Sequence, residues 1–152
     1  MSRSVVAAVC YRRRSQSLQF LLVRAGPGTW TFPKGHVKKW ERDMLWHAAL
    51  REAREEAGAL GCLVSRKPFA RYRYLKPKST KEHSVAAYLL EVELQAKPYE
   101  TWRRPAWYTP RQATRQLGAV RAPRYAKEHE RVLAKAVALQ RGRGTVGRKR
   151  GQ

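Results

Sequence analysis

GHVKKWERDMLWHAALREAREEAGA (residues 35–59) holds five of the eleven Asp and Glu residues of this 152-residue chain, in which Lys and Arg outnumber acids three to one. The last nine residues place Glu52, Glu55 and Glu56 at positions i, i+3 and i+4. Residues at this spacing are neighbours on one face of an α-helix. The stretch therefore predicts a helix with an acidic face, and that face is the candidate site of chemistry.

The rest of the helix follows from a rotation of roughly 100° per residue. The three glutamates fall within about 100° of one another, and the apolar residues cluster roughly 120° away. These apolar residues are Trp46, Ala49, Leu50, Ala53 and Ala57. We expect the helix to run from about Asp43, as its N-cap, to Ala57, with Gly58 as a left-handed C-cap. One face is then buried while the opposite face carries negative charge.

Two interpretations of the acidic face remain open from the residues alone. Like charges at this spacing repel by a few tenths of a kcal/mol per pair, so a purely structural helix gains nothing from gathering them. Mg²⁺ would remove this penalty, because it binds through a few carboxylates, waters and substrate phosphate. The alternative is a solvated charged face, with Arg51 and Arg54 as ordinary ion-pair partners.

The same stretch resembles the signature of the Nudix hydrolases. That signature is Gly, five residues, Glu, seven residues, Arg-Glu, an aliphatic residue, any residue, Glu-Glu, any residue, Gly and an aliphatic residue. It is filled in order by Gly35, Glu41, Arg51, Glu52, Ala53, Glu55, Glu56, Gly58 and Ala59. One departure is that nine residues, not seven, separate Glu41 from Arg51, and counting back seven positions lands on Asp43. Either acid can fill the orienting position.

The resemblance implies metal-assisted hydrolysis of a phosphoanhydride bond. In this interpretation Glu52, Glu55 and Glu56 bind Mg²⁺ or Mn²⁺, and Glu55 is the first choice for the group that takes a proton from the attacking water. Arg51 would pair with Glu41 or Asp43 and hold the preceding loop against the helix. The fold implied is an α/β/α sandwich with a mixed sheet.

The residues before the helix carry the opposite charge. The run Trp30-Thr-Phe-Pro-Lys34-Gly35-His36 is similar to that of Nudix members that cleave dinucleoside polyphosphates or diphosphoinositol polyphosphates. Lys34 and His36, with Arg24 and His83, are then the candidate phosphate-binding residues. The simpler alternatives are a solvated loop lysine for Lys34, a hydrogen-bonded turn residue for His36 and a structural or exposed histidine for His83.

The remaining sequence predicts one domain over residues 1–140. Strands are expected near residues 4–11, 18–23, 30–32, 62–75, 83–94 and 107–109, with a polar turn at 12–16. Short helices are expected from Pro110 to Leu117 and from Pro123 to Leu139. This order is consistent with the α/β/α sandwich. Residues 141–152 are basic and glycine-rich without periodicity, and we expect a disordered tail there.

Composition limits the partners and the compartment. A net charge of +22 requires an anionic environment or partner. An anionic polyphosphate substrate satisfies this, and RNA is possible but not required. No run approaches 18 apolar residues, and the apolar stretch near the N-terminus is too short for a signal peptide, so we expect a cytoplasmic protein. Cys10 and Cys62 lack metal-site spacing and are expected to be reduced, buried thiols.

Three classes of function therefore compete. The first is a hydrolase of polyphosphates, with a variant acting on nucleoside triphosphates, oxidised nucleotides or RNA 5′ ends. The second is a non-catalytic module that keeps the fold and binds RNA or nucleotide. The third is a basic RNA-packing protein, for which net charge is the only support.

Overall fold

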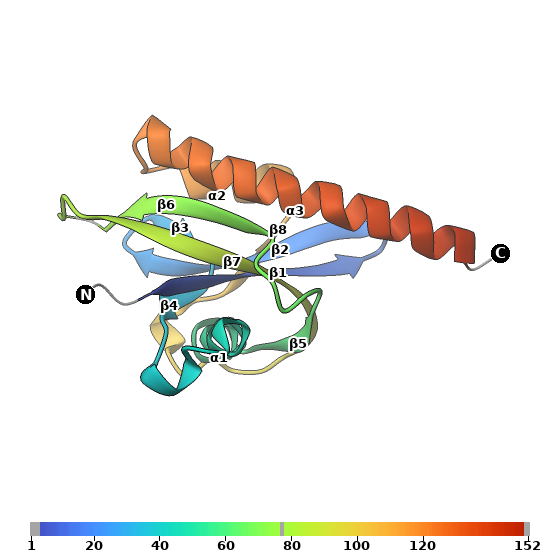
Figure 1. Ribbon diagram of the computed structural model, residues 1–152. Helices are drawn as coiled ribbons and strands as arrows, with labels where there is room; N and C mark the ends of the chain where they lie inside the picture. The colour runs from blue at the N-terminus through green and yellow to red at the C-terminus, as the bar shows by residue number, and fades with distance from the viewer. Residues whose placement is uncertain (1–3, 77, 151–152) are drawn as a thin grey trace.

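Two long strands, β1 (Val5–Arg14) and β7 (Glu82–Gln95), form the centre of the sheet in the computed structural model (Figure 1). The structure describes residues 4–76 and 78–150, with side chains described to residue 142. β1 and β7 are parallel, in register from Val5 opposite Val85 to Tyr11 opposite Glu91. Their apolar β-branched residues fit a buried pair covered on both faces.

Each central strand pairs with two further strands along its outer side. β4 (Lys34–His36) pairs with the beginning of β1, and β2 (Ser17–Gly26) pairs with its end. β6 (Ala70–Leu75) pairs with the beginning of β7, and β5 (Ala59–Leu63) pairs with its end. β3 (Thr29–Thr31) and β8 (Ala106–Tyr108) both pair with β2. Only the β1–β7 pair is parallel, so the sheet is mixed.

Helices cover both faces of the sheet, which gives the predicted α/β/α sandwich (Figure 1). α1 (Leu45–Ala57) packs on one face. α2 (Pro110–Gly118) and α3 (Pro123–Arg150) pack on the other. Two 3₁₀ turns, η1 (Lys39–Glu41) and η2 (Thr101–Arg103), lie in the connections on the α1 side. None of the helices within the described residues is long and apolar enough to cross a membrane.

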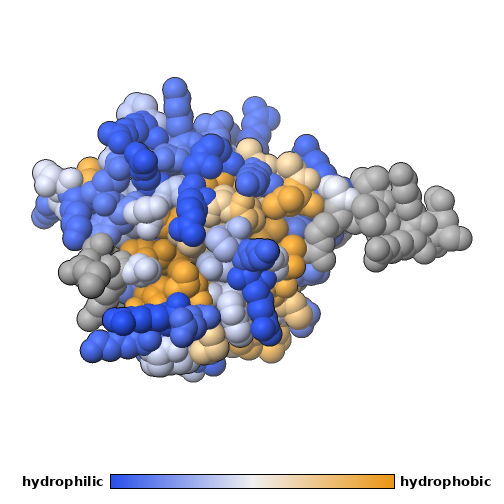
Figure 2. All heavy atoms as spheres, in the orientation of Figure 1, coloured by the Kyte–Doolittle hydropathy of each residue, from blue (hydrophilic) through white to orange (hydrophobic). Residues whose placement is uncertain are grey.

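Two apolar cores result, one on each face of the sheet. The core under α1 is lined by alanines of the helix, Ala48, Ala49, Ala53 and Ala57, all fully buried. Such small side chains allow the helix to lie close to the strands, which brings its acidic face near β4. The core under α2 and α3 contains larger residues, including Phe20, Phe32 and Tyr72. In Figure 2 hydrophilic side chains cover most of the upper part of the face shown, over α3, and apolar side chains form a band below.

Several predicted boundaries were wrong. β1 continues through Arg12 to Arg14, and the turn is only Ser15 and Gln16, both with positive φ (51° and 64°) as a two-residue hairpin requires. The strand predicted over 62–75 is two strands, β5 and β6, separated by a loop. Cys62, in β5, was predicted to be buried but is exposed, because it lies on the outward face of that strand, whereas Cys10 is buried as predicted. β4 was not predicted, because three residues carry no alternation pattern.

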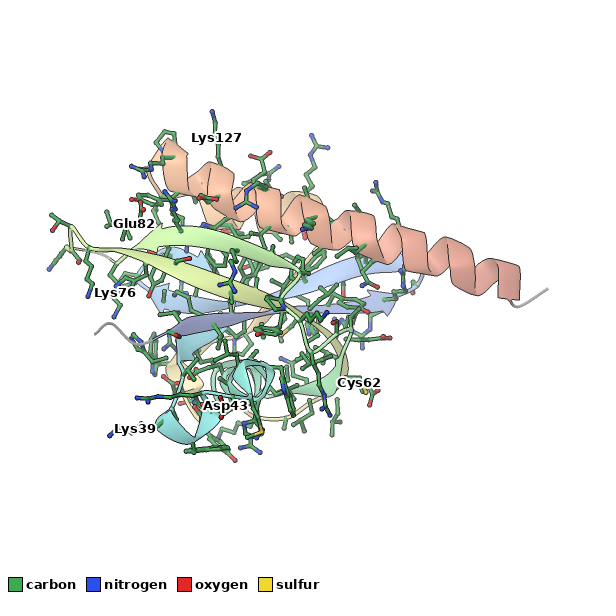
Figure 3. The ribbon with its side chains drawn as sticks, in the orientation of Figure 1. Lys39, Asp43, Cys62, Lys76, Glu82 and Lys127 are labelled. Atoms are coloured by element: carbon green, nitrogen blue, oxygen red, sulfur yellow. The ribbon has the colours of Figure 1, made fainter. Side chains whose placement is uncertain are left out.

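The ends of the helices also differ from the sequence prediction. α1 begins at Leu45 with Met44 at the N-cap, and Asp43 lies outside it with an exposed side chain (Figure 3). Gly58 is the left-handed C-cap, as predicted, with φ of 65°. α3 does not end at Leu139 but continues to Arg150. Glycines cost a helix about 1 kcal/mol each without forbidding it, and no proline follows Pro123. Disorder of residues 141–152 in solution stays a prediction, and 151–152 lie outside the described residues.

Candidate active site

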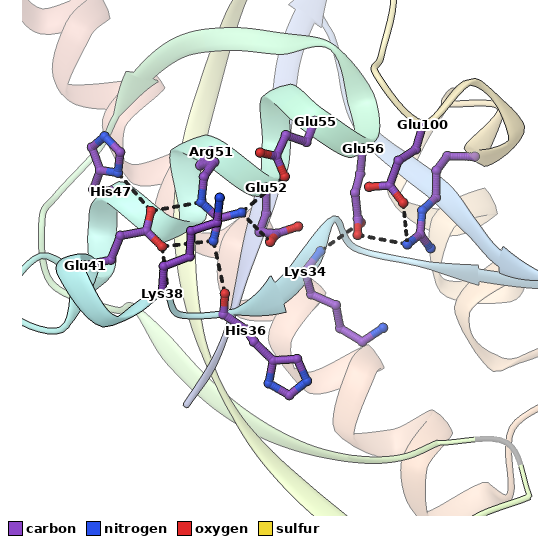
Figure 4. A network of polar contacts seen from close by, with 11 residues as sticks. Lys34, His36, Lys38, Glu41, His47, Arg51, Glu52, Glu55, Glu56 and Glu100 are labelled. Carbon is purple, nitrogen blue, oxygen red and sulfur yellow. Dashed lines mark hydrogen bonds and ion pairs between the residues drawn. The ribbon is translucent and has the colours of Figure 1, made fainter. Parts of the chain in front are cut away.

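Arg51 is the centre of the polar network between α1 and the loop before it (Figure 4). Its Nε and Nη2 donate to the two carboxylate oxygens of Glu41, both at 2.9 Å. Nη2 also donates to the carbonyl of His36, at 3.0 Å. Nη1 donates to Glu52 at 2.8 Å and to Glu55 at 3.1 Å. One guanidinium therefore holds the loop against the helix and offsets the repulsion between neighbouring carboxylates.

Glu41, and not Asp43, fills the orienting position. Glu41 is fully buried and also accepts from the Lys38 backbone N–H at 3.0 Å, while His47 Nδ1 lies 3.0 Å from its second oxygen. Burial alone would raise the pKa of Glu41, but the hydrogen bonds from Arg51, Lys38 and His47 lower that pKa to about 2. The two extra residues therefore lie between Glu41 and the start of α1, where the chain forms an exposed turn.

Gly35 allows the Glu52 carboxylate to pack directly against the backbone of β4. A Cβ at residue 35 would lie 2.2 Å from Oε1 of Glu52 and 2.6 Å from Oε2. Even the smallest side chain would therefore displace this carboxylate. The absence of a Cβ at residue 35 thus fixes where the buried Glu52 carboxylate can lie.

Glu56 lies at the other end of the acidic face (Figure 4). It accepts from the backbone N–H of Lys34 at 3.1 Å, and Arg103 Nη2 lies 3.1 Å from its other oxygen. Burial raises the pKa of Glu56 to about 7 despite the nearby Arg103, and burial also raises the pKa of Glu52. Burial lowers the pKa of Lys34 to about 8, with Glu56 opposing that shift. An additional cation would stabilise the charged form of both carboxylates.

These residues fit a hard divalent cation without forming a finished cage. Within residues 4–76 and 78–142, no three Asp, Glu, His or Cys side chains converge on one point as metal ligands. Mg²⁺ does not need such a cage, because it retains several waters and binds through few carboxylates together with substrate phosphate. Glu52, Glu55 and Glu56 share one helix face, which lies beside Gly35 and Lys34 of β4. They are the residues that could hold such an ion.

A groove of about 610 Å³ adjoins the acidic face. Tyr74 and Tyr125 line it together with a set of cationic side chains. This set is Lys34, Lys76, Lys78, Arg103 and Arg121. Lys34 Nζ lies 4.7 Å from the centroid of the Tyr74 ring. A polyanion with an aromatic or other flat group fits these walls, with its phosphates directed toward the carboxylates.

The structure brings together some of the predicted phosphate-binding residues but not all. Lys34 lines the groove. His83 stacks on Tyr74, at 5.2 Å between centroids, and faces His36 at 6.5 Å, but neither histidine lines the groove. The His36 ring points away from the carboxylates (Figure 4). Arg24 does not line the groove; its guanidinium lies 5.5 Å from the Trp30 ring, and its carbonyl accepts from Arg103.

Two cationic residues of the site were missed as site residues from the sequence. Arg103 bridges Glu56, Glu100 and the Arg24 carbonyl, and Arg121 donates to the carbonyls of Trp30 and Leu117. Both lie far from residues 35–59 in the chain and in no regular pattern. An arginine in a loop carries no local signal of this kind, so only the fold could place them.

Comparison with known proteins bears on the family of the chain. The model of a family described as NUDIX domain matches residues 1–135. The asymmetrical bis(5′-nucleosyl)-tetraphosphatase of Caenorhabditis elegans is 47% identical over 51 residues, which span 32% of this chain and 36% of the relative. The enzyme of the same name from Sus scrofa is 39% identical over 66 residues, 38% of this chain and 44% of the relative. The alignments thus span less than half of either relative.

Solved structures extend the likeness to nearly the whole chain. A binary complex of the Ap4A hydrolase of C. elegans superposes with a TM-score of 0.73 at 25% identity, covering 93% of this chain and 99% of that one. The NUDIX domain of Shewanella oneidensis NrtR, complexed with ADP ribose, has a TM-score of 0.66 at 16% identity over 92% of this chain and 90% of that domain. The second likeness concerns the fold alone.

Proposed function

The chain belongs to the NUDIX domain family, and on this premise we propose that it hydrolyses a phosphoanhydride bond of a dinucleoside polyphosphate with the help of Mg²⁺ or Mn²⁺. The observation that carries the proposal is the Arg51 network, which holds Glu41 and the His36 carbonyl on one side and Glu52 and Glu55 on the other. It supports a fixed acidic centre directly beside a cationic groove. The relatives named as tetraphosphatases and Ap4A hydrolase support this substrate class.

Each residue of the centre has a distinct proposed role. Glu52, Glu55 and Glu56 would hold the metal ion, which when bound offsets phosphate charge and acidifies a water molecule. Glu55 is the most exposed of the three, with 26% of its side chain accessible against 9% for Glu52 and 5% for Glu56. A group that takes a proton from an attacking water must reach that water, so Glu55 remains the first choice.

The groove supplies the substrate contacts. Lys34 and Arg103 lie between the carboxylates and the groove and would bind the phosphates nearest the scissile bond. Arg121 is held by two backbone carbonyls and so presents a cation in a fixed place. Such fixed charges stabilise the charge that develops on the leaving phosphate. Tyr125, which is half-buried in the wall of the groove, offers a ring for a nucleobase, whereas Tyr74 is buried and stacked with His83.

Diphosphoinositol polyphosphates are a second substrate class for the same site. The observation in their favour is the set of five cationic side chains along one groove, since an inositol ring densely substituted with phosphate needs several cations and no base-stacking surface. The two classes differ in the use of Tyr125. Tyr125→Leu should weaken the binding of a dinucleoside polyphosphate by about 1–3 kcal/mol, through the loss of base stacking, and leave the binding of inositol substrates nearly unaffected.

The experiment is a turnover assay of the purified protein on four substrates. These are diadenosine tetraphosphate, diphosphoinositol polyphosphate, a nucleoside triphosphate and RNA with a 5′ triphosphate, each with Mg²⁺, with Mn²⁺ and with a chelator. The control is Glu130→Gln, which removes an exposed carboxylate of α3. We expect metal-dependent cleavage of diadenosine tetraphosphate that falls at least about 100-fold in Glu55→Gln and is unchanged in Glu130→Gln. No turnover of any substrate, or equal turnover in Glu55→Gln and wild type, would refute the proposal.

A further inference from the structure

The proposed active site leaves most of the positive charge of this protein unexplained. The cations of the groove are few, whereas the chain carries 33 Lys and Arg against 11 acids. The charge is also unevenly distributed, since residues 1–40 and 131–152 contain no Asp or Glu at all. These two acid-free segments are far apart in the sequence, so their arrangement in the fold decides whether their charges add.

The fold brings the two segments together. Arg13, at the end of β1, donates through Nη2 to the carbonyl of Gln140 in α3, at 2.7 Å. The β1–β2 hairpin and the C-terminal part of α3 therefore project from the same end of the molecule, on the right in Figure 1. Arg13 and Arg14, at the end of β1, and Arg141, which follows Gln140 in α3, all have exposed side chains. We call this region, with Arg111 of α2, the basic end.

A shallow groove continues the basic end between α2 and α3. It has a volume of about 310 Å³, with Arg111 and Arg141 in its walls. Its apolar lining includes Leu133 and Val137, and Glu130 is the one acid among its lining residues. Cations along a partly apolar groove suit a single-stranded nucleic acid, because the cations can bind its phosphates while the apolar side chains contact its bases.

The basic end cannot serve the proposed active site. β1 begins at Val5, opposite His36, and reaches Arg14 nine residues later. At about 3.3 Å per residue this separates the basic end from the loop at His36 by about 30 Å. A small polyphosphate held beside the carboxylates has no contact with these arginines. A longer polyanion must be the partner if the charge has one.

We propose that the basic end binds nucleic acid through its phosphate backbone, without reading base sequence. This goes beyond the proposed hydrolase activity and does not depend on it. Arginines pair with phosphates through two parallel N–H donors, and neutralised phosphates release their counterions, which makes such binding strongly salt-dependent. The partner chosen is nucleic acid because it presents a continuous row of phosphates to arginines that come from three elements, β1, α2 and α3.

The test compares two triple variants that remove the same charge from different places. The first is Arg14→Gln, Arg111→Gln and Arg141→Gln, all exposed residues of the basic end. The matched control is Lys39→Gln, Lys97→Gln and Lys127→Gln, three exposed lysines outside it, of which Lys39 and Lys127 are labelled in Figure 3. Fluorescence anisotropy measures binding of a labelled single-stranded RNA of about 20 nucleotides over a series of NaCl concentrations.

We expect wild type and the control to bind nearly equally, and the basic-end variant to bind at least about tenfold more weakly. The magnitude of the slope of log K against log salt should fall by about 2 in that variant, because each of the three lost phosphate contacts contributes about 0.7 to it. Duplex DNA should show the same order of affinities. Three results would overturn the proposal: no RNA binding at about 100 mM NaCl, equal losses in both triple variants, or preferential binding to phosphatidylserine vesicles.

Discussion

Replacing Glu41 by Gln tests the ion pair between Arg51 and Glu41, which holds the segment before α1 against that helix. The buried Glu41 carboxylate accepts hydrogen bonds from Nε and Nη2 of Arg51, each at 2.9 Å, and from the Lys38 backbone N–H at 3.0 Å. Glutamine keeps the size of the side chain and removes its charge, much as protonation would. The stability lost on substitution can therefore be estimated from the pKa of Glu41.

The pKa of Glu41 is about 2 in the folded protein against an ordinary value of 4.5. Because the folded-state pKa is lowered, its contribution to stability is complete above about pH 5 and is lost as the pH falls toward 2. A difference of about 2.5 pKa units corresponds to about 3 kcal/mol at neutral pH, and about 1 kcal/mol of this remains at pH 3. The loss in Glu41→Gln should follow the same pH dependence.

Urea denaturation in the presence of a chelator, at about pH 7 and about pH 3, measures the difference. The control is Asp43→Asn, which removes the exposed carboxylate that the sequence allowed as an alternative and should change stability by less than about 0.5 kcal/mol. A loss in Glu41→Gln that does not depend on pH would contradict the estimate, as would equal losses in the two variants.

Three further predictions follow from single residues. Gly35→Ala should reduce metal-dependent turnover at least about 100-fold, because its Cβ would lie 2.2 Å from a site carboxylate oxygen, whereas Gly26→Ala, with nothing within 4 Å, should retain full activity. Gly58→Ala should lower the free energy of unfolding, measured by urea denaturation, by more than about 2 kcal/mol, since φ is positive and the Cβ would lie 1.9 Å from a backbone carbonyl. Gly28→Ala, with positive φ in open space, should lower it by about 1 kcal/mol. The pKa of Glu56 is raised to about 7 in the metal-free folded protein, so folding of the wild type becomes less favourable as the pH rises from 4.5 to 7. Glu56→Gln lacks this titration, and its free energy of unfolding relative to wild type should therefore increase by up to about 3 kcal/mol over that range. A difference between the two proteins that stays constant with pH would contradict this prediction.

The sequence predicted the parts of the molecule that depend on local spacing. The acidic face and the Gly58 cap lie within one helix, where residues three and four apart must be neighbours. The alternative between Glu41 and Asp43 could not be settled, because the turn before α1 has no fixed period. The fold decides it, since Glu41 in η1 reaches Arg51 and Asp43 does not.

Contacts between distant segments could not be predicted from one sequence. β4 is too short for a pattern, yet its pairing with the beginning of β1 fixes the positions of its own residues Lys34 and Gly35. Arg103 and Arg121 reach the site only because later loops return to the same edge of the sheet. Net charge was readable from composition, but its concentration at one end depends on the contact between Arg13 and Gln140.

Binding of Mn²⁺ followed by electron paramagnetic resonance tests the central claim most directly, because it requires no assumption about the substrate. We predict that wild type and Glu130→Gln bind the ion equally, and that the double variant Glu52→Gln, Glu55→Gln binds it at least about tenfold more weakly. Unchanged Mn²⁺ affinity in the double variant would contradict the assignment of the acidic face of α1 as the metal site.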